Sequence, residues 1–425
     1  MTNLKRNTVY LHLFGINRMI DTRILERLSK RAQSPLSVCM ITALTYGVFL
    51  LVRLGVHHFD LGAFVVAGDH FCNAAEMPAP ISVAKDSDGY DGQFYYRLAL
   101  NPFTRERLDY GILLDSPSHR QQRILYPLIV WILALGNAHW IPTLMVMVNY
   151  AGLCALAYLA ALYARGMGIS PAWGLVVPFF PGFVLTLSRD LVEITAMTAV
   201  MTGILLARHN RRCAAAALFT LAVFARETTL LIPLSYFAAS LIGGFRQGQP
   251  DPTSPHRIKL AASAPYLAPL AAYIVWQLHL ASVWGNTPLA ANKSSLSIPL
   301  AGLCQSLLSA IPPTQDFHQG LLLFHILCIT LFALMVIRSL TREDILSPHG
   351  IAWLGYLLLV ASFSANFLWS NDWNYIRGLS EFCIIGSLLL IKSPYRLWCL
   401  VWTPTFLYYL FLRTDIIHAM LSRIR

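Results

Sequence analysis

The first place in the chain where side chains could do chemistry is a stretch of carboxylates separated by glycines. Asp86, Asp88 and Asp91 lie within six residues of one another. The residues after them predict a short helix over 91–100, with Asp91 at its start and Tyr95 one turn along. A carboxylate held there could act as a general base. It could equally do no more than cap the helix, by accepting hydrogen bonds from the first free amides.

Four further groups of charged residues lie at the ends of apolar segments. They are Arg123-Ile124-Leu125-Tyr126-Pro127, Ser188-Arg189-Asp190-Leu191-Val192-Glu193, Arg226-Glu227-Thr228 and Trp373-Asn374-Tyr375-Ile376-Arg377. Each has a plain explanation: a snorkelling arginine, a solvated helix start, a self-neutralising pair or an interfacial aromatic belt. Together they indicate a site, because guanidinium groups bind phosphate with two parallel hydrogen bonds and carboxylates supply a base.

Composition places these groups in a membrane. Of 425 residues, 56% are hydrophobic and 12% are charged, about half the charged fraction of a soluble domain. The net charge of +11 fits cytoplasmic loops that follow the positive-inside rule, so we do not expect nucleic-acid binding. The eight cysteines are scattered, mostly in or beside apolar runs, which argues against a disulfide or zinc framework. The predicted fold is all-α, a polytopic bundle of about 11–12 membrane segments.

The apolar runs give a predicted topology. They are 36–57, 124–137, 141–163, 172–187, 191–207, 213–225, 229–245, 260–282, 319–338, 350–369, 378–391 and 397–412. Basic loops at 1–35, 208–212 and 246–259 are predicted to be cytoplasmic, which places the long loop 58–123 outside. If 124–137 crossed the membrane, the number of crossings between 1–35 and 208–212 would be odd, and the two loops could not both be cytoplasmic. We therefore predict that 124–137 re-enters the membrane rather than crosses it. The alternative is an ordinary short span with a miscounted neighbour. We divide the chain into a basic segment 1–35, a catalytic module 36–245 and a C-terminal module 246–425.

These motifs resemble the GT-C superfamily of membrane glycosyltransferases, which use polyprenyl-phosphate sugars at the outer face. Asp91, Tyr95 and Ala99 are similar to that family's loop acid followed by an aromatic and a small residue at helical spacing. The Tyr126-Pro127 pair looks like the start of that family's next helix. The segment from Ser188 to Glu193 looks like its later acidic segment, and the segment from Ala225 to Thr228 looks like its Thr-Arg-x-Thr break. The string from Asp91 to Tyr96 resembles a bacterial subfamily associated with cell-surface glycopolymers. Two departures from the family pattern are that we expect no large C-terminal soluble domain and that Gly92 stands where a second acid is common.

The resemblance implies an inverting glycosyltransferase in the plasma (inner) membrane, with its site outside and its N-terminus in the cytoplasm. Asp91 would deprotonate the acceptor, a glycan or glycolipid, and arginines would bind the phosphate of the polyprenyl-phosphate donor beside the membrane lipids. The expected phosphate ligands are Arg123, Arg226 and Arg377, supported by Arg97 or Arg189; residues expected to assist the acceptor or a metal are Asp86, Asp88, Tyr95, Asp190, Glu193 and Glu227. No spacing demands a metal: a calcium loop starting at Asp86 would have Arg97 in place of its final Glu. A divalent cation (Mg or Mn) stays an open option. The rival hypotheses are a transporter or flippase for a lipid-linked or anionic solute, and a non-catalytic assembly subunit.

Overall fold

The computed structural model describes residues 34–79, 81–243, 245–246, 249–250, 261–291, 295–309, 317–366 and 368–413. Within these residues the protein is mostly helical, as its composition predicts, and each strand is only two residues long. All but the last two residues of the predicted basic segment 1–35 lie outside the described part, as does most of the predicted cytoplasmic loop 246–259.

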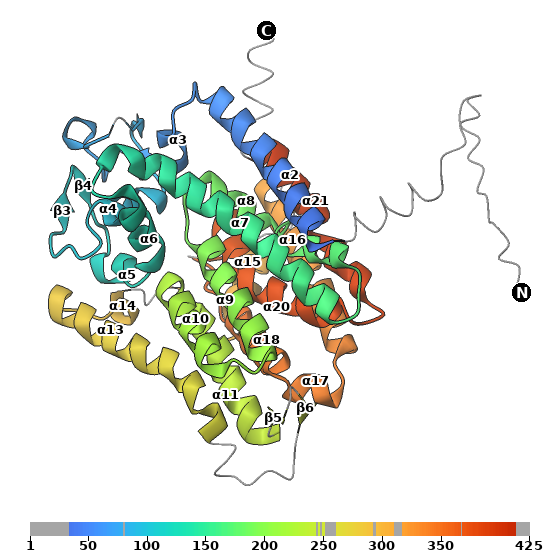
Figure 1. Cartoon of the computed structure of the whole chain (residues 1–425). Coiled ribbons are helices and arrows are strands. Elements are labelled where there is room, and N and C mark those ends of the chain that lie inside the picture. The colour runs from blue at the N-terminus through green and yellow to red at the C-terminus, as the bar shows by residue number, and fades with distance from the viewer. Residues whose placement is uncertain are drawn as a thin grey trace, which may run out of the picture.

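The predicted outer loop folds into a compact unit after the first helix, α2 (Pro35–Val56). Its elements are α3 (Gly62–Val65), β1 (Ala67–Gly68), a 3₁₀ turn (Ala74–Glu76), β2 (Val83–Ala84), α4 (Gly92–Leu100), β3 (Leu108–Asp109), β4 (Ile112–Leu113) and α5 (Pro117–Gln121). The β1–β2 pair is parallel, with Ala67 opposite Val83, and the β3–β4 pair is antiparallel, with Leu108 opposite Leu113. Figure 1 shows α4, α5, β3 and β4 gathered beside α6 (Leu125–Ala134) at one side of the molecule.

The central helices follow the predicted apolar runs, with one break. They are α7 (Ile141–Gly166), α8 (Pro181–Ser188), α9 (Glu193–Arg208), α10 (Arg212–Ala225) and α11 (Leu231–Gly243), with 3₁₀ turns at Ala138–Trp140, Pro171–Val176 and Glu227–Leu230. The run 172–187 is not one helix, since the chain leaves the 3₁₀ turn at Val176 and restarts at Pro181. Two prolines explain this: Pro178 lacks the N–H that a continuing helix needs, and Pro181 suits a first helical position.

The C-terminal part begins with an antiparallel pair, β5 (Phe245–Arg246) and β6 (Gln249–Pro250). Its helices are a 3₁₀ turn (Ala264–Leu267), α13 (Ala268–Trp284), α14 (Pro288–Ala291), α15 (Ala301–Ser309), α16 (Phe317–Ser339), α17 (Arg342–Leu346), α18 (Pro348–Ala361), α19 (Asp372–Gly378), α20 (Ser380–Leu390), a 3₁₀ helix (Arg396–Trp402), α21 (Thr403–Tyr408) and a short π-helix (Tyr409–Arg413). The predicted run 350–369 ends early as a helix. After Ala361 the backbone bonds across to another segment, where Ser297 N–H donates to Ser362 O (2.7 Å) and Ser364 N–H to Ser295 O (3.1 Å).

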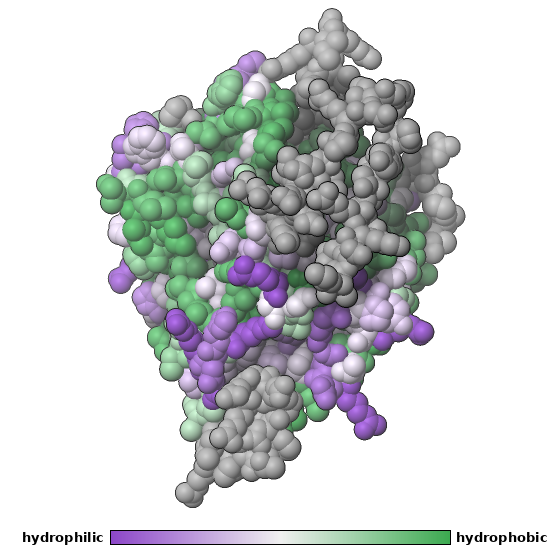
Figure 2. All heavy atoms as spheres, turned by 45° about the vertical axis from the view of Figure 1, so that its right-hand side comes forward, coloured by the Kyte–Doolittle hydropathy of each residue, from purple (hydrophilic) through white to green (hydrophobic). Residues whose placement is uncertain are grey.

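Within the described residues, four helical segments are long and apolar enough to cross a membrane: Pro35–Val56, Ala138–Gly166, Ala261–Trp284 and Phe317–Ser339. Their length and composition indicate a membrane protein. Helix α2 carries an exposed apolar stripe at helical spacing, formed by Leu36, Met40, Leu44, Val48 and Leu51. Such a stripe fits contact with lipid. Hydrophobic residues also cover much of the face drawn in Figure 2, while hydrophilic side chains gather in its lower half.

The segment predicted to re-enter the membrane forms the short helix α6. It has ten residues, so at 1.5 Å per residue it extends about 15 Å, roughly half the hydrocarbon thickness. It ends where Leu135 and Gly136 both adopt left-handed backbone conformations. This length agrees with a helix that does not cross, and the side on which it begins and ends stays a prediction.

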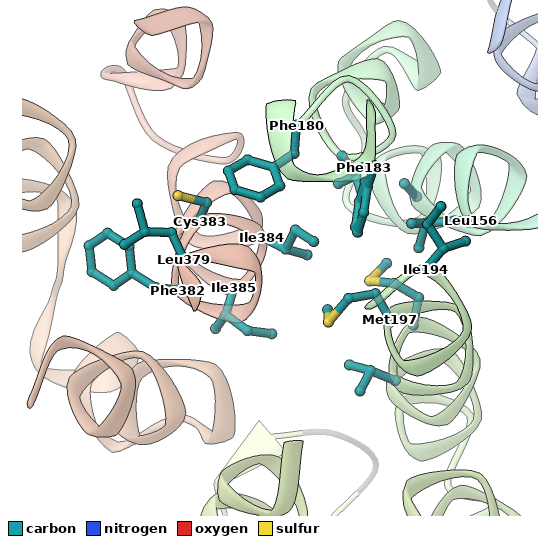
Figure 3. Packing of buried hydrophobic residues seen from close by; sticks show 14 of the residues in the cluster. Leu156, Phe180, Phe183, Ile194, Met197, Leu379, Phe382, Cys383, Ile384 and Ile385 are labelled. Carbon is teal, nitrogen blue, oxygen red and sulfur yellow. The ribbon is translucent and has the colours of Figure 1, made fainter. Parts of the chain in front are cut away.

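The largest hydrophobic core lies where α7, α8, α9 and α20 meet. Figure 3 shows Phe180 and Phe183 at α8 turned toward residues of α20 such as Ile384, with Met197 of α9 nearby. Helices α9 and α10 approach closely because Gly203 has no side chain: a Cβ there would lie 2.5 Å from the Phe219 ring. This rigid packing fixes the ends of α9 and α20, which carry part of the charged site described next.

Candidate functional site

The start of α4 holds Asp91 in a constrained turn. Gly89 has a left-handed backbone with φ of +62°, which glycine adopts without strain. Gly92 lies directly against the turn between α8 and α9, because a Cβ there would be only 2.4 Å from Arg189 O. The glycines that separate the carboxylates in the sequence thus allow the loop to bend and to seat against the helix core.

The Asp91 carboxylate does not cap α4, although the residue occupies the cap position. Instead it accepts from Arg120 Nη1 at 2.8 Å and from Arg377 Nη1 at 3.1 Å. Arg120 belongs to α5 and Arg377 to α19, so the carboxylate joins the folded loop to the C-terminal part. The capping interpretation therefore does not account for this side chain.

Behind Asp91 lies a buried group of charges that we call the base: Glu193, Arg226, Arg377 and Glu381. The Glu193 carboxylate accepts from Arg226 Nη1 at 2.6 Å and from Arg377 Nη2 at 2.8 Å. Arg226 Nε also lies 2.8 Å from Glu381 Oε1. Four chain segments meet here: the first turns of α9 and α20, the α10–α11 junction and α19.

A second group, which we call the rim, lies nearer the surface: Asp91, Arg120, Arg123 and Glu227. Arg123 pairs with Glu227 through two hydrogen bonds of 2.9 and 2.6 Å and donates to the Tyr95 hydroxyl at 3.3 Å. Arg120 pairs in the same two-pronged way with Asp115, at 2.9 and 2.7 Å. Asp91 joins the rim to the base, because Arg377 pairs with both Asp91 and Glu193.

Burial separates the two groups. In the rim, the side chains of Asp91 and Glu227 are 20% and 22% exposed, and those of Arg120 and Arg123 are each 13% exposed. In the base, Glu193 and Glu381 are 0% and 2% exposed, and both arginines are 8% exposed. A water-borne or lipid-borne ligand therefore meets the rim first.

The network is almost neutral as it stands. Its four arginines face five carboxylates, counting Asp115, and each guanidinium already donates to a carboxylate. An incoming anion would have to displace a carboxylate from an arginine rather than fill an empty cation site. Such an exchange is easiest at the rim, where water can solvate the displaced carboxylate.

Aromatic rings line the network on one side. The Tyr90 hydroxyl accepts from Arg377 Nη1 at 2.9 Å. The Arg189 guanidinium stacks over the Trp373 ring, 3.7 Å from its centroid, and lies 5.6 Å from that of Tyr90. Arg189 thus lies next to the base through its contacts with these two rings.

Among the titratable groups of the loop, Asp91 and His119 have shifted pKa values that bear directly on the site. Burial alone would raise the pKa of Asp91, but Arg120 and Arg377 outweigh it and hold that pKa well below its usual range. Burial, helped by the charge of Arg123, lowers the pKa of His119 to about 4. At neutral pH Asp91 is therefore ionised and His119 is uncharged.

The structure brings most of the expected site residues together. Those in the network or touching it are Asp91, Tyr95, Arg123, Arg189, Glu193, Arg226, Glu227 and Arg377. Sequence reasoning missed Arg120 and Glu381 as members. Their spacing was a signal, since Arg120 precedes Arg123 by three residues and Glu381 follows Arg377 by four, the spacings that a helix brings together. Neither pair lies within a single helix of the structure.

Four expected residues lie elsewhere. Arg97, in the last turn of α4, is fully buried and pairs with Asp109 at 3.1 Å. Asp190 is buried beside the Tyr126 hydroxyl, 3.5 Å away.

Asp86 and Asp88 sit in the exposed turn before α4, where Asp88 pairs with His70 at 2.8 Å. In the described ranges, no three His, Cys, Asp or Glu side chains converge in a way that could hold a metal ion. The loop acids therefore do not gather into a common cluster, and the prediction of a divalent cation remains open.

Comparison with known proteins adds no relative to this picture. No protein-family model matches the chain, and no match was found among curated proteins or solved structures. The geometry of the site is therefore what indicates its chemistry.

Proposed function

We propose that the chain is an inverting membrane glycosyltransferase that moves a sugar from a polyprenyl-phosphate donor to a glycan or glycolipid acceptor. The observation that supports this most is the position of Asp91, a partly exposed carboxylate held between the arginines Arg120 and Arg377. This reaction needs two parts, a general base and groups that bind phosphate.

The reaction begins with exchange of ion-pair partners. The donor phosphate binds the rim arginines Arg120 and Arg123, and it displaces the carboxylates that they hold. Loss of a cation raises the pKa of Asp91, because its charged form is then less favoured. The carboxylate becomes a better base only when donor is present, which limits wasteful reaction with water.

The chemical step then follows. Asp91 takes the proton from an acceptor hydroxyl, whose oxygen attacks the anomeric carbon of the donor sugar. The bond between that carbon and the phosphate oxygen breaks, and the polyprenyl phosphate leaves with the bonding electrons. Arginines around the phosphate stabilise the negative charge that develops there. In this proposal Arg377 and Arg226, anchored on Glu193, are positioning residues that hold Asp91 and the rim in place.

The proposal also includes a topology, a GT-C-like bundle of about 11–12 segments in the plasma membrane with the folded loop outside. Single cysteines at Lys85 and Asn210, both exposed, test it in a background lacking Cys72, Cys213 and Cys304. An impermeant thiol reagent applied to intact cells should label the first and not the second. Labelling of both from one side would contradict the topology.

Transfer itself is tested with purified full-length protein and a panel of polyprenyl-phosphate sugars, with Mg²⁺, with Mn²⁺ and with a chelator. Release of polyprenyl phosphate should depend on acceptor. Asp91→Asn should lower the rate by roughly 10²–10⁴-fold while donor binding survives. Asp88→Asn, in the exposed turn outside the network, is the matched control and should keep its rate.

Two results would count against the proposal. If no donor reacts but a lipid-linked sugar crosses proteoliposome membranes, the chain is a transporter or flippase. If Asp91→Asn reacts as fast as the unmodified protein, Asp91 is not the general base of the reaction.

A further inference from the structure

A polar cavity of about 710 Å³ lies between α15, the start of α16 and α19. Its volume falls within the range of about 300–1,000 Å³ that is typical of small-ligand sites. The lining is rich in hydroxyl and amide groups, which include Gln305, Ser306, Gln319 and Asn371, and it includes the aromatic Trp369. Such a surface offers many neutral hydrogen-bond donors and acceptors beside an aromatic ring.

An apolar crevice of about 180 Å³ adjoins this cavity. It is lined by side chains of α15, α16 and α18, among them Leu303, Ile326, Ile329 and Val360. Trp369 lines both spaces, and α15 and α16 contribute residues to each. The two spaces therefore lie side by side, and we treat them together as one amphipathic site with a polar part and an apolar part.

The charge of the lining separates this site from the arginine network. Among the described lining residues of the two spaces there is no Lys or Arg, and Asp372 is the one carboxylate. A phosphate would find only His318 as a side chain able to carry positive charge, whereas sugar hydroxyls pair well with amides, hydroxyls and one carboxylate. The apolar crevice in turn fits a hydrocarbon chain.

We infer that this amphipathic site binds a glycolipid with an uncharged sugar headgroup, the headgroup in the polar cavity and the lipid chain in the crevice. The assignment of this glycolipid as the acceptor rests on the proposed function. Helix α19 links the two places, because Asp372 and Tyr375 line the cavity and Arg377 contacts Asp91. A headgroup in the cavity therefore lies beside the helix that positions Asp91, the proposed general base.

The test uses the full chain, purified in a detergent without a sugar, and a photoreactive probe: dodecyl β-glucoside with a diazirine in its alkyl chain. Irradiation should cross-link the crevice, with modified peptides from α15, α16 and α18. The matching dodecyl phosphocholine probe, whose headgroup is zwitterionic and contains a phosphate, should label this site at least tenfold less. Equal labelling by both probes, or labelling spread over lipid-facing helices such as α2, would overturn the inference.

Variants decide whether the polar cavity selects the headgroup. Ser306→Trp adds a large ring to the cavity and should abolish cross-linking. Gln305→Leu is a gentler change that keeps the side-chain size but removes its hydrogen bonds, and should lower cross-linking several-fold. Leu308→Trp, on the same helix at a 75% exposed position outside both linings, is the control and should label normally. Normal labelling of Gln305→Leu and Ser306→Trp would refute a headgroup site.

Free sugar and transfer kinetics complete the test. Excess glucose should compete only weakly with the probe, because it lacks the chain; full competition would show a site for free sugars instead. In transfer assays Gln305→Leu should raise KM for a glycolipid acceptor and leave that for the donor unchanged. Cross-linking needs no turnover, so a specific cross-link without any transfer would reject the glycosyltransferase proposal and keep the glycolipid site. Transfer without a specific cross-link at this site would reject the glycolipid site alone.

Discussion

The rim and the base of the charge network contain the same side chains, arginines and carboxylates, yet burial gives them different tasks. At the rim, Asp91 and Glu227 are about one-fifth exposed, so water can solvate either partner when a pair opens. In the base, Glu193 is fully buried between Arg226 and Arg377. Opening that group would leave charges without partners in a medium of low dielectric. The comparison teaches that the rim can exchange partners and that the base can only hold them.

The largest expected effect lies on stability, in the base. Glu193→Gln leaves two buried arginines without their shared partner, and we expect a loss of about 3–5 kcal/mol in the free energy of unfolding. The matched rim change, Glu227→Gln, should cost about 1 kcal/mol or less, as for a solvated pair. Thermal and denaturant unfolding of the purified variants measure both. Equal losses at the two positions would remove the distinction between rim and base.

The next effect concerns binding, at the rim. Arg123→Lys keeps the charge but loses the two-pronged geometry. A lost hydrogen bond to a charged group is worth about 1.5–3 kcal/mol, so donor affinity should fall roughly 10- to 100-fold while the melting temperature changes little. Binding of polyprenyl phosphate measures this.

The control for that change lies in the base. Arg226→Lys should lower the melting temperature more than Arg123→Lys does, because its charge is buried and serves two carboxylates. If Arg226→Lys instead weakens donor binding at unchanged stability, Arg226 contacts the phosphate, as the sequence first indicated.

The smallest effect marks the edge of the network. Asp86 lies in the exposed turn before α4 with a left-handed backbone, φ of +52°. Asp86→Asn keeps a side chain that tolerates this conformation, so stability should change by about 0.5 kcal/mol or less. Donor affinity should not change. A clear loss of donor binding would bring this turn into the site and reopen the question of a metal there.

Local features of the site followed from the sequence. The helix predicted over 91–100 is α4, and the glycines around Asp91 lie where a positive φ and a close backbone approach are needed. Local backbone preference decides such features, so neighbouring residues suffice to predict them. Helix ends were harder, because α18 stops where a distant segment supplies hydrogen bonds.

The sequence by itself determined a mostly helical membrane protein whose charges gather at helix ends, because few charged residues and long apolar runs permit little else. Only the tertiary structure decided which charges meet. Arg377 reaches Asp91 across 286 residues of sequence, and Arg97, six residues from Asp91, pairs elsewhere. The exposure of each pair and the shape of the cavity depend on how distant helices pack. That packing is a sum of many contacts that no local pattern encodes.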